Sequence, residues 1–230
     1  MSFALRLTED RLGAGVRLAL PATPRVLYAR DSASRIEIRP PTVQGDLAAP
    51  AATRHHLVPG TAWHGTGDVV VAADAPAVVL RVELLRGAGV EGANAATSGS
   101  RRLLEHTIEL DPARAWLMRC DRVEFAPGGV ALPHGHKGGG IRCLLAGTLE
   151  VTVGEGPPRQ MRPGDAWFES GREPVLAKAS TTETTAFVRV SILPQEIRGQ
   201  SSIVYVDPAA AGRGRPRQYT VYLDEPLVLP

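Results

Sequence analysis

An internal repeat constrains the fold of this chain more than any other feature of its sequence. Four short segments recur in the second half in the same order: GV at 15–16 and 129–130, RVLYA at 25–29 and RCLLA at 142–146, PGTAW at 59–63 and PGDAW at 163–167, and VLRVEL at 79–84 and FVRVSI at 187–192. Any one match arises easily by chance, but an ordered set of four indicates two copies of one folding unit. A chain of 230 residues is long enough for two domains that each bury a core.

The repeated unit is predicted to be all-β. The 24 glycines and 19 prolines cut the chain into short runs that are rich in Val, Ile, Leu and Thr, such as RIEIR, DVVVAA, TLEVTV and TAFVRVSIL. Short β-favouring runs with turn residues between them are typical of a sandwich or a barrel. Only RRLLEHTIEL at 101–110 fits a helix, and it fits a strand about as well.

Charge and composition exclude several classes of partner. The net charge is only +2, which gives no reason to expect nucleic acid or an anionic membrane as a partner. No run of about 18 apolar residues occurs, and the first residues show no signal-peptide core. The two cysteines, Cys120 and Cys143, match neither a disulfide framework nor a zinc motif. We therefore expect a cytoplasmic protein.

Two segments of the second half resemble the motifs of the cupin superfamily. The first is PGGVALPHGHKGGGIRCLLAGTLEV at 127–151, and the second is MRPGDAWF at 161–168. The motif positions that match are Gly128, His134, His136 and Gly147 in the first segment and Pro163, Gly164 and Asp165 in the second. The resemblance covers 119–193 and extends weakly to the first half through the repeat. It implies a double-stranded β-helix, the cupin or jelly-roll barrel, in each of two tandem repeats.

The resemblance and the repeat together predict four parts of the chain. We expect a degenerate cupin-like barrel over 1–95, a linker over 96–111, and a cupin_2-like barrel with the His-x-His pair over 112–205. A C-terminal extension over 206–230 contains the strand candidate QYTVYL, which is expected to pair with the other half or with a second subunit.

The motifs also depart from the family pattern at two of its four metal-ligand positions. Gly140 stands where the family has a glutamate, and Val175 falls near the place of the second-motif histidine. The corresponding stretch of the first half, VRLALPATPRVLYA, contains no histidine. Only His134 and His136 remain, and both would face the same side of a strand.

A third ligand is needed, because a stable catalytic metal site usually has three protein ligands. The candidates are Glu169, on the strand after the Pro-Gly-Asp turn, and Glu173 in the following loop. Two histidines and one carboxylate would suit a divalent ion such as Fe, Mn, Ni or Zn.

Arg142 and the glycine run at 138–140 each allow alternative interpretations. Arg142 should share the inward face with Gly140, where it either forms a buried ion pair with Glu169 or binds the carboxylate of a substrate. The glycines either permit a close approach and enlarge a pocket, or form a flexible loop without a role.

Two functions remain compatible with these residues. One is a metal-binding cupin that acts on or binds a small molecule, anionic if Arg142 holds it. If that protein is an enzyme, the resemblance implies dioxygenase- or isomerase-like chemistry with Arg142 and Glu169 as catalytic residues. The other is a non-catalytic bicupin that binds or senses a small molecule and has a degenerate metal site. The exposed edge strands of such barrels favour a homodimer.

Overall fold

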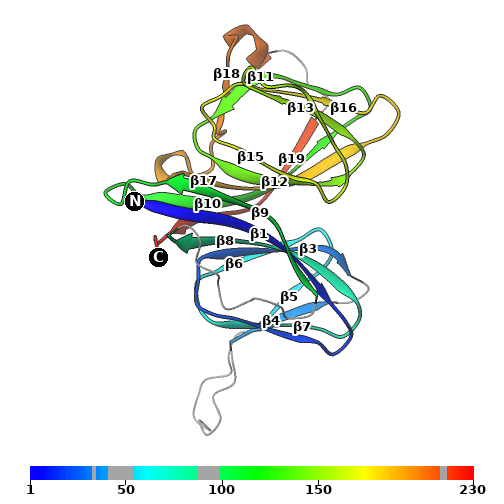
Figure 1. Cartoon of the computed structure of the whole chain (residues 1–230), viewed down its shortest axis with the longest axis vertical. Helices are drawn as coiled ribbons and strands as arrows, with labels where there is room; N and C mark the ends of the chain where they lie inside the picture. Colours follow the sequence, from blue (N-terminus) through cyan, green and yellow to red (C-terminus); the bar gives the residue numbers. More distant parts are fainter. Residues whose placement is uncertain (33–34, 41–53, 88–98, 213–216) are drawn as a thin grey trace, which may run out of the picture. The chain divides into compact units, whose positions relative to one another are not determined.

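The computed structural model describes residues 1–32, 35–40, 54–87, 99–212 and 217–230 (Figure 1). The described chain is built from antiparallel strands and two short 3-10 helices, and it contains no helix long and apolar enough to cross a membrane. It divides into two compact units, Met1–Leu110 with Leu229–Pro230, and Asp111–Val228. The predicted all-β architecture with two tandem repeats is confirmed.

The first unit consists of two sheets that enclose an apolar core. The larger sheet has the order β6 (Ala62–Gly65), β3 (Arg25–Ser32), β8 (Ala77–Arg86), β1 (Ser2–Leu12) and β9 (Ser100–Glu109). The smaller sheet has the order β2 (Arg17–Leu20), β7 (Val69–Ala73), β4 (Ile36–Arg39) and β5 (His55–Leu57). Leu27 and Val79 from the first sheet pack with Ile36 and Val71 from the second, as alternating apolar residues on paired sheets should.

The second unit repeats this arrangement with two five-stranded sheets, which we call the second barrel. One sheet has the order β15 (Ala166–Glu169), β12 (Gly140–Ala146), β17 (Thr185–Pro194), β10 (Trp116–Phe125) and β19 (Arg217–Leu227). The other has the order β14 (Arg159–Met161), β13 (Leu149–Val153), β16 (Val175–Ala179), β11 (Val130–His136) and β18 (Ile203–Tyr205). The helices η1 (Gln195–Ile197) and η2 (Pro208–Gly212) flank β18 in the chain.

Strand register corrects one of the repeat matches. In the first unit Leu27 lies opposite both Trp63 and Arg81. In the second unit Arg142 lies opposite Trp167 and Arg189. Since the tryptophans and Arg81/Arg189 match in the sequence repeat, the counterpart of Arg142 is Leu27, and RVLYA and RCLLA are out of register by two residues.

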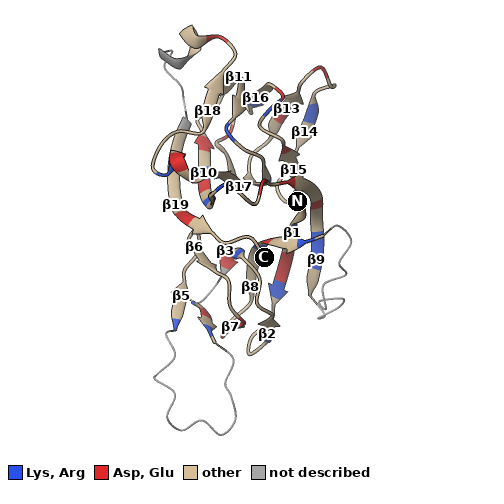
Figure 2. Cartoon of the chain, turned by 90° about the vertical axis from the view of Figure 1, so that its left-hand side faces the viewer, with Lys and Arg blue, Asp and Glu red and all other residues tan. Residues whose placement is uncertain are grey.

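The boundary between the units differs from the expected linker over 96–111. Residues 96–98 lie outside the described part of the chain, but Ser100–Glu109 forms β9, which pairs with β1 and completes the first unit. The segment 101–110 is therefore largely a strand. As an edge strand, β9 carries the charged residues Arg101, Arg102 and Glu105, which oppose edge-to-edge pairing (Figure 2).

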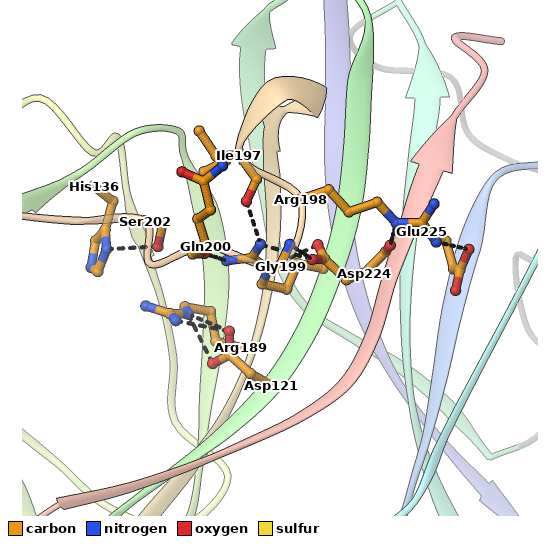
Figure 3. Close-up of polar contacts among 11 residues, drawn as sticks. Asp121, His136, Arg189, Ile197, Arg198, Gly199, Gln200, Ser202, Asp224 and Glu225 are labelled. Atoms are coloured by element: carbon orange, nitrogen blue, oxygen red, sulfur yellow. Dashed lines mark hydrogen bonds and ion pairs between the residues drawn. The ribbon is translucent and has the colours of Figure 1, made fainter.

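The C-terminal extension pairs within its own unit, contrary to the expectation that it would reach the other half or a second subunit. Strand β19 lies beside β10. Asp224 fixes it there: Arg119 donates to both carboxylate oxygens at 2.9 Å, and the backbone N–H of Gly199 donates at 2.6 Å (Figure 3). The second barrel thus includes an edge strand from the segment that follows the predicted cupin boundary at 205.

The glycine run at 138–140 meets a packing requirement at the start of β12. Gly140 begins β12, and a Cβ atom there would lie 2.5 Å from the carbonyl oxygen of Val190 on β17. A Cβ at Gly138 would collide with the carbonyl oxygen of Ile192. The glutamate that the cupin pattern places at 140 does not fit against this neighbour.

Candidate functional site

Polar side chains from four strands converge on a cavity in the second barrel. His134 and His136 come from the end of β11, Arg142 from β12, Glu169 from β15 and Arg189 from β17. The cavity is narrow, with a volume of about 20 Å³, and its remaining walls are mainly apolar side chains such as Val123, Phe125, Leu149, Val175 and Phe187. Strand alternation explains the convergence, because residues two apart on a strand face the same side.

The carboxylate of Glu169 contacts three other side chains of this site. Its Oε1 accepts a hydrogen bond from Trp167 Nε1 at 2.8 Å, and its Oε2 lies 2.7 Å from Arg142 Nη2 and 3.4 Å from His136 Nε2. Burial alone would raise the pKa of Glu169, but the Arg142 charge and the donors from His136 and Trp167 outweigh it and hold the pKa well below its usual range. Glu169 is therefore an ionised, buried carboxylate.

Arg142 is buried and only partly hydrogen-bonded. Its Nη1 donates to the carbonyl oxygens of Gly140 at 2.5 Å and Glu169 at 3.4 Å. Its Nη2 forms the ion pair with Glu169, but the alignment is not that of a hydrogen bond, so this buried nitrogen has no hydrogen-bond partner among the described residues. Burial lowers the pKa of Arg142 to about 10, against the opposing effect of Glu169, which leaves the side chain charged at neutral pH.

The two histidines are close together and buried. Their ring centroids are 5.0 Å apart, with the rings edge to face. His134 Nδ1 lies 2.7 Å from the carbonyl oxygen of Leu132, and His136 Nδ1 lies 3.5 Å from Ser202 Oγ (Figure 3). Burial lowers the pKa of His136 to about 3, helped by Arg142 and Arg189 and opposed by Glu169. His136 is therefore a neutral imidazole at pH 7.

The described residues do not fit a divalent metal ion. They contain no group of three or more His, Cys, Asp or Glu side chains placed to hold one. Glu173, one of the predicted ligands, is exposed and accepts a hydrogen bond from Ser170 Oγ at 2.7 Å. A cation at Glu169 would have to compete with the Arg142 guanidinium and would lie in a cavity that Arg189 also lines.

Sequence reasoning missed the second arginine of the cavity. Arg189 Nε and Nη2 donate to Asp121 at 3.1 and 2.8 Å, and Asp121 lies directly opposite on β10 (Figure 3). The repeat VLRVEL/FVRVSI contains Arg189, so the alternation of β17 could have placed it on the inner face. Tyr219, which also lines the cavity, comes from β19 and could not have been assigned without knowing that this strand joins the barrel.

Comparisons with known proteins identify the fold of this region. A family model described as Cupin domain matches residues 121–190, and no curated protein matches the chain. A variant of oxalate decarboxylase from Bacillus subtilis is 13% identical, with a TM-score of 0.61 over 91% of this chain and 73% of that one. Salicylate 1,2-dioxygenase from Pseudaminobacter salicylatoxidans is 11% identical, with a TM-score of 0.52 over 94% and 74%. Procruciferin, an 11S globulin from Brassica napus, is 9% identical, with a TM-score of 0.56 over 81% and 75%. At these identities the likeness shows the fold.

Proposed function

Because the second unit carries a cupin domain, we propose that this protein binds a small organic molecule inside its second barrel, and that it does so without a divalent metal ion. The observation that carries the proposal is the lining of the cavity, whose space of about 20 Å³ a ligand has to widen by displacing side chains. Apolar side chains form most of its wall, while Arg142, Glu169, His134 and His136 meet on one side of it. A concave apolar site with a few convergent polar groups is typical of small-molecule binding.

The charge balance inside the barrel supports an organic ligand over a cation. Arg142 is compensated by Glu169 and Arg189 by Asp121, and His136 is neutral. Each buried carboxylate is therefore already matched by a guanidinium. The polar groups left to a ligand are hydrogen-bonding ones, which fix the orientation of a molecule whose apolar part contacts the walls.

A metal-dependent enzyme is the second candidate. The 5.0 Å separation of the His134 and His136 rings favours it, and two of the structural neighbours are oxalate decarboxylase and salicylate 1,2-dioxygenase. In that function the two imidazoles would hold the ion, and the ion would supply Lewis-acid or redox chemistry. Arg142 would orient the substrate beside it.

Metal analysis separates the two candidates. Untagged protein, purified without chelator or added metal, is analysed by plasma mass spectrometry beside a His134→Ala/His136→Ala variant. We expect metal far below one equivalent in both proteins, unchanged after incubation with Fe, Mn, Ni or Zn salts. Near-stoichiometric metal that disappears in the variant would overturn the metal-free proposal and favour the enzyme.

Ligand binding is read from Trp167, whose indole lines the cavity and donates to Glu169. A panel of small organic acids and neutral analogues of the same size is titrated while tryptophan emission is recorded. A bound molecule should change the emission of the wild-type protein and leave that of Trp167→Phe unchanged, although Trp63 and Trp116 remain. A panel in which no member alters the emission or the melting temperature would contradict binding in this cavity.

A further inference from the structure

One carboxylate oxygen of Glu169 contacts both an imidazole and a guanidinium. Its Oε2 lies 3.4 Å from His136 Nε2 and 2.7 Å from Arg142 Nη2. Two ligand atoms of a tetrahedral metal ion, each bonded at about 2.0–2.1 Å, lie about 3.3 Å apart. The imidazole nitrogen and the carboxylate oxygen therefore already have the separation of two ligands of one ion, and the positive charge beside them is that of the guanidinium.

His134 lies next to this pair in an orientation that suits a third ligand. Its ring is edge to face with that of His136, with the centroids 5.0 Å apart. Its Nδ1 lies 2.7 Å from the carbonyl oxygen of Leu132, an acceptor that requires the ring proton on Nδ1 and so makes Nε2 the basic nitrogen. Histidines that bind a metal ion usually donate their other ring N–H in this way.

Arg142 supplies the cation of this cluster from within the chain. The side chain is buried, and its Nη1 donates to the carbonyl oxygens of Gly140 and Glu169, which holds the guanidinium in place. A divalent ion on Glu169 Oε2 would lie beside this buried charge, where little water screens the repulsion. Arg189 does not provide a second cation for Glu169, because it donates to Asp121.

The first unit lacks the acid, the cation and the histidines together. Leu27 and Gly65 stand at the register positions of Arg142 and Glu169. The stretch VRLALPATPRVLYA, which corresponds to the His-x-His segment, contains no histidine. The four polar groups of the second barrel are thus one set, present in one copy and missing from the other.

The buried arginines of the first unit show what a purely structural arrangement looks like in this chain. Glu83 accepts from Arg25 Nε at 3.2 Å through one oxygen and from Arg81 Nη1 at 2.6 Å through the other. The described contacts of this carboxylate are two guanidinium groups and no histidine. The second barrel differs because an imidazole shares the oxygen to which the guanidinium is paired.

We infer that the second barrel contains a latent metal site, formed by His134, His136 and Glu169, which the guanidinium of Arg142 blocks by taking the place of the ion. With Arg142 present, the described residues contain no group of three ligands set around an ion. Without it, the cluster has the space and the unmatched negative charge that a divalent ion such as Zn or Co requires. The inference rests on the proposed function, because it gives the reason why the wild-type barrel binds no such ion.

Arg142→Ala tests the inference, and Arg142→Lys is the matched control because it keeps a positive charge. The untagged proteins are incubated with Zn or Co salts, desalted and analysed for metal by plasma mass spectrometry. We expect Arg142→Ala to retain about one equivalent and to melt at a higher temperature with the ion, since the ion binds the folded state. The wild type and Arg142→Lys should retain far less and show no such rise. Equal metal contents in Arg142→Ala and Arg142→Lys would overturn the inference.

Two double variants locate the bound ion. Arg142→Ala/His136→Ala and Arg142→Ala/Glu169→Gln each lack one of the inferred ligands, so both should lose the metal and the rise in melting temperature. Metal that both double variants retain would be bound elsewhere, for instance at the exposed neighbours His55 and His56, and the latent site would not exist.

The wild-type protein distinguishes the inference from the function on which it rests. Near-stoichiometric metal in the wild type would overturn both, because Arg142 would then exclude nothing. Absence of metal from both the wild type and Arg142→Ala would leave the proposed function intact and overturn the inference alone. If Arg142→Ala does not fold, Arg142→Met, which keeps the apolar stem of the side chain, replaces it. Failure of both variants to fold even with Zn or Co present would also contradict the inference, since the ion would not substitute for the guanidinium.

Discussion

His136 is the residue that should control how the second barrel responds to mild acid. Its pKa lies at about 3 in the folded protein, against an ordinary value of 6.5, because burial, Arg142 and Arg189 outweigh the attraction of Glu169. Between these two values the unfolded chain binds a proton that the folded chain does not. The free energy of unfolding therefore decreases as the pH falls below 6.5, by at most about 1.4 kcal/mol per pH unit.

The pH range between 6.5 and 4.5 isolates this effect. Glu169, whose folded pKa is lowered, contributes stability that is lost only as the pH falls below its ordinary value of 4.5. We expect His136→Gln to flatten the decline of stability between pH 6.5 and 4.5, measured by urea unfolding. The exposed His106 provides the control as His106→Gln. An unchanged slope in His136→Gln would be incompatible with a buried neutral imidazole.

The Arg142–Glu169 ion pair makes a second prediction at the residue scale. Removing one partner leaves the other buried and unmatched, so Arg142→Leu and Glu169→Gln should each lower the free energy of unfolding by about 3–5 kcal/mol. The first unit has Leu27 and Gly65 at the corresponding register positions and folds without this pair. The double variant should therefore be more stable than either single one. If chemical unfolding showed a loss in the double variant equal to the sum of the two single losses, Arg142 and Glu169 would not be coupled.

At the scale of elements, the contact between β12 and β17 depends on glycine. A Cβ at position 140 would approach the Val190 carbonyl oxygen to 2.5 Å and the Ser191 Cα to 2.8 Å. Gly140→Ala should therefore lower the free energy of unfolding by about 1–3 kcal/mol, measured by thermal or urea unfolding. Gly67→Ala is the matched control, since a Cβ there has nothing within 4 Å. If Gly140→Ala left the free energy of unfolding unchanged, β12 and β17 would be able to move apart at this point without loss of stability.

A buried ion pair adds to the backbone ladder that holds β19 against β10. Asp224 accepts from Arg119 and from the Gly199 N–H, and these donors lower its pKa against the effect of burial. Asp224→Ala should release the strand, so that limited proteolysis followed by mass spectrometry detects faster cleavage after residue 205. Glu225→Ala, which removes only the exposed pair with Arg198, is expected to be cleaved at the wild-type rate. If Asp224→Ala and Glu225→Ala were cleaved at equal rates, the Asp224 carboxylate would not be the group that holds β19.

At the scale of the whole molecule, the ordered repeat and the short β-runs were sufficient to predict the two tandem units. The register of β3 against β12 was not predictable from similarity, because a shift by two residues leaves every side chain on its own face. The structure brings His134, His136, Arg142 and Glu169 to one cavity, as strand alternation indicates, and leaves Glu173 exposed. The predicted end of the second barrel at 205 was too early, because β19 (Arg217–Leu227) pairs with β10 (Trp116–Phe125), which lies far from it in the sequence.

The two copies of the repeat neutralise their buried arginines from different strands. In the first unit Glu83 on β8 accepts from both Arg25 and Arg81, whereas in the second barrel the carboxylate beside Arg142 is that of Glu169 on β15. Exchanging any one of these residues for its counterpart in the other copy would leave a buried charge unmatched. The duplicated halves have therefore diverged to a point where single residues are no longer interchangeable between them.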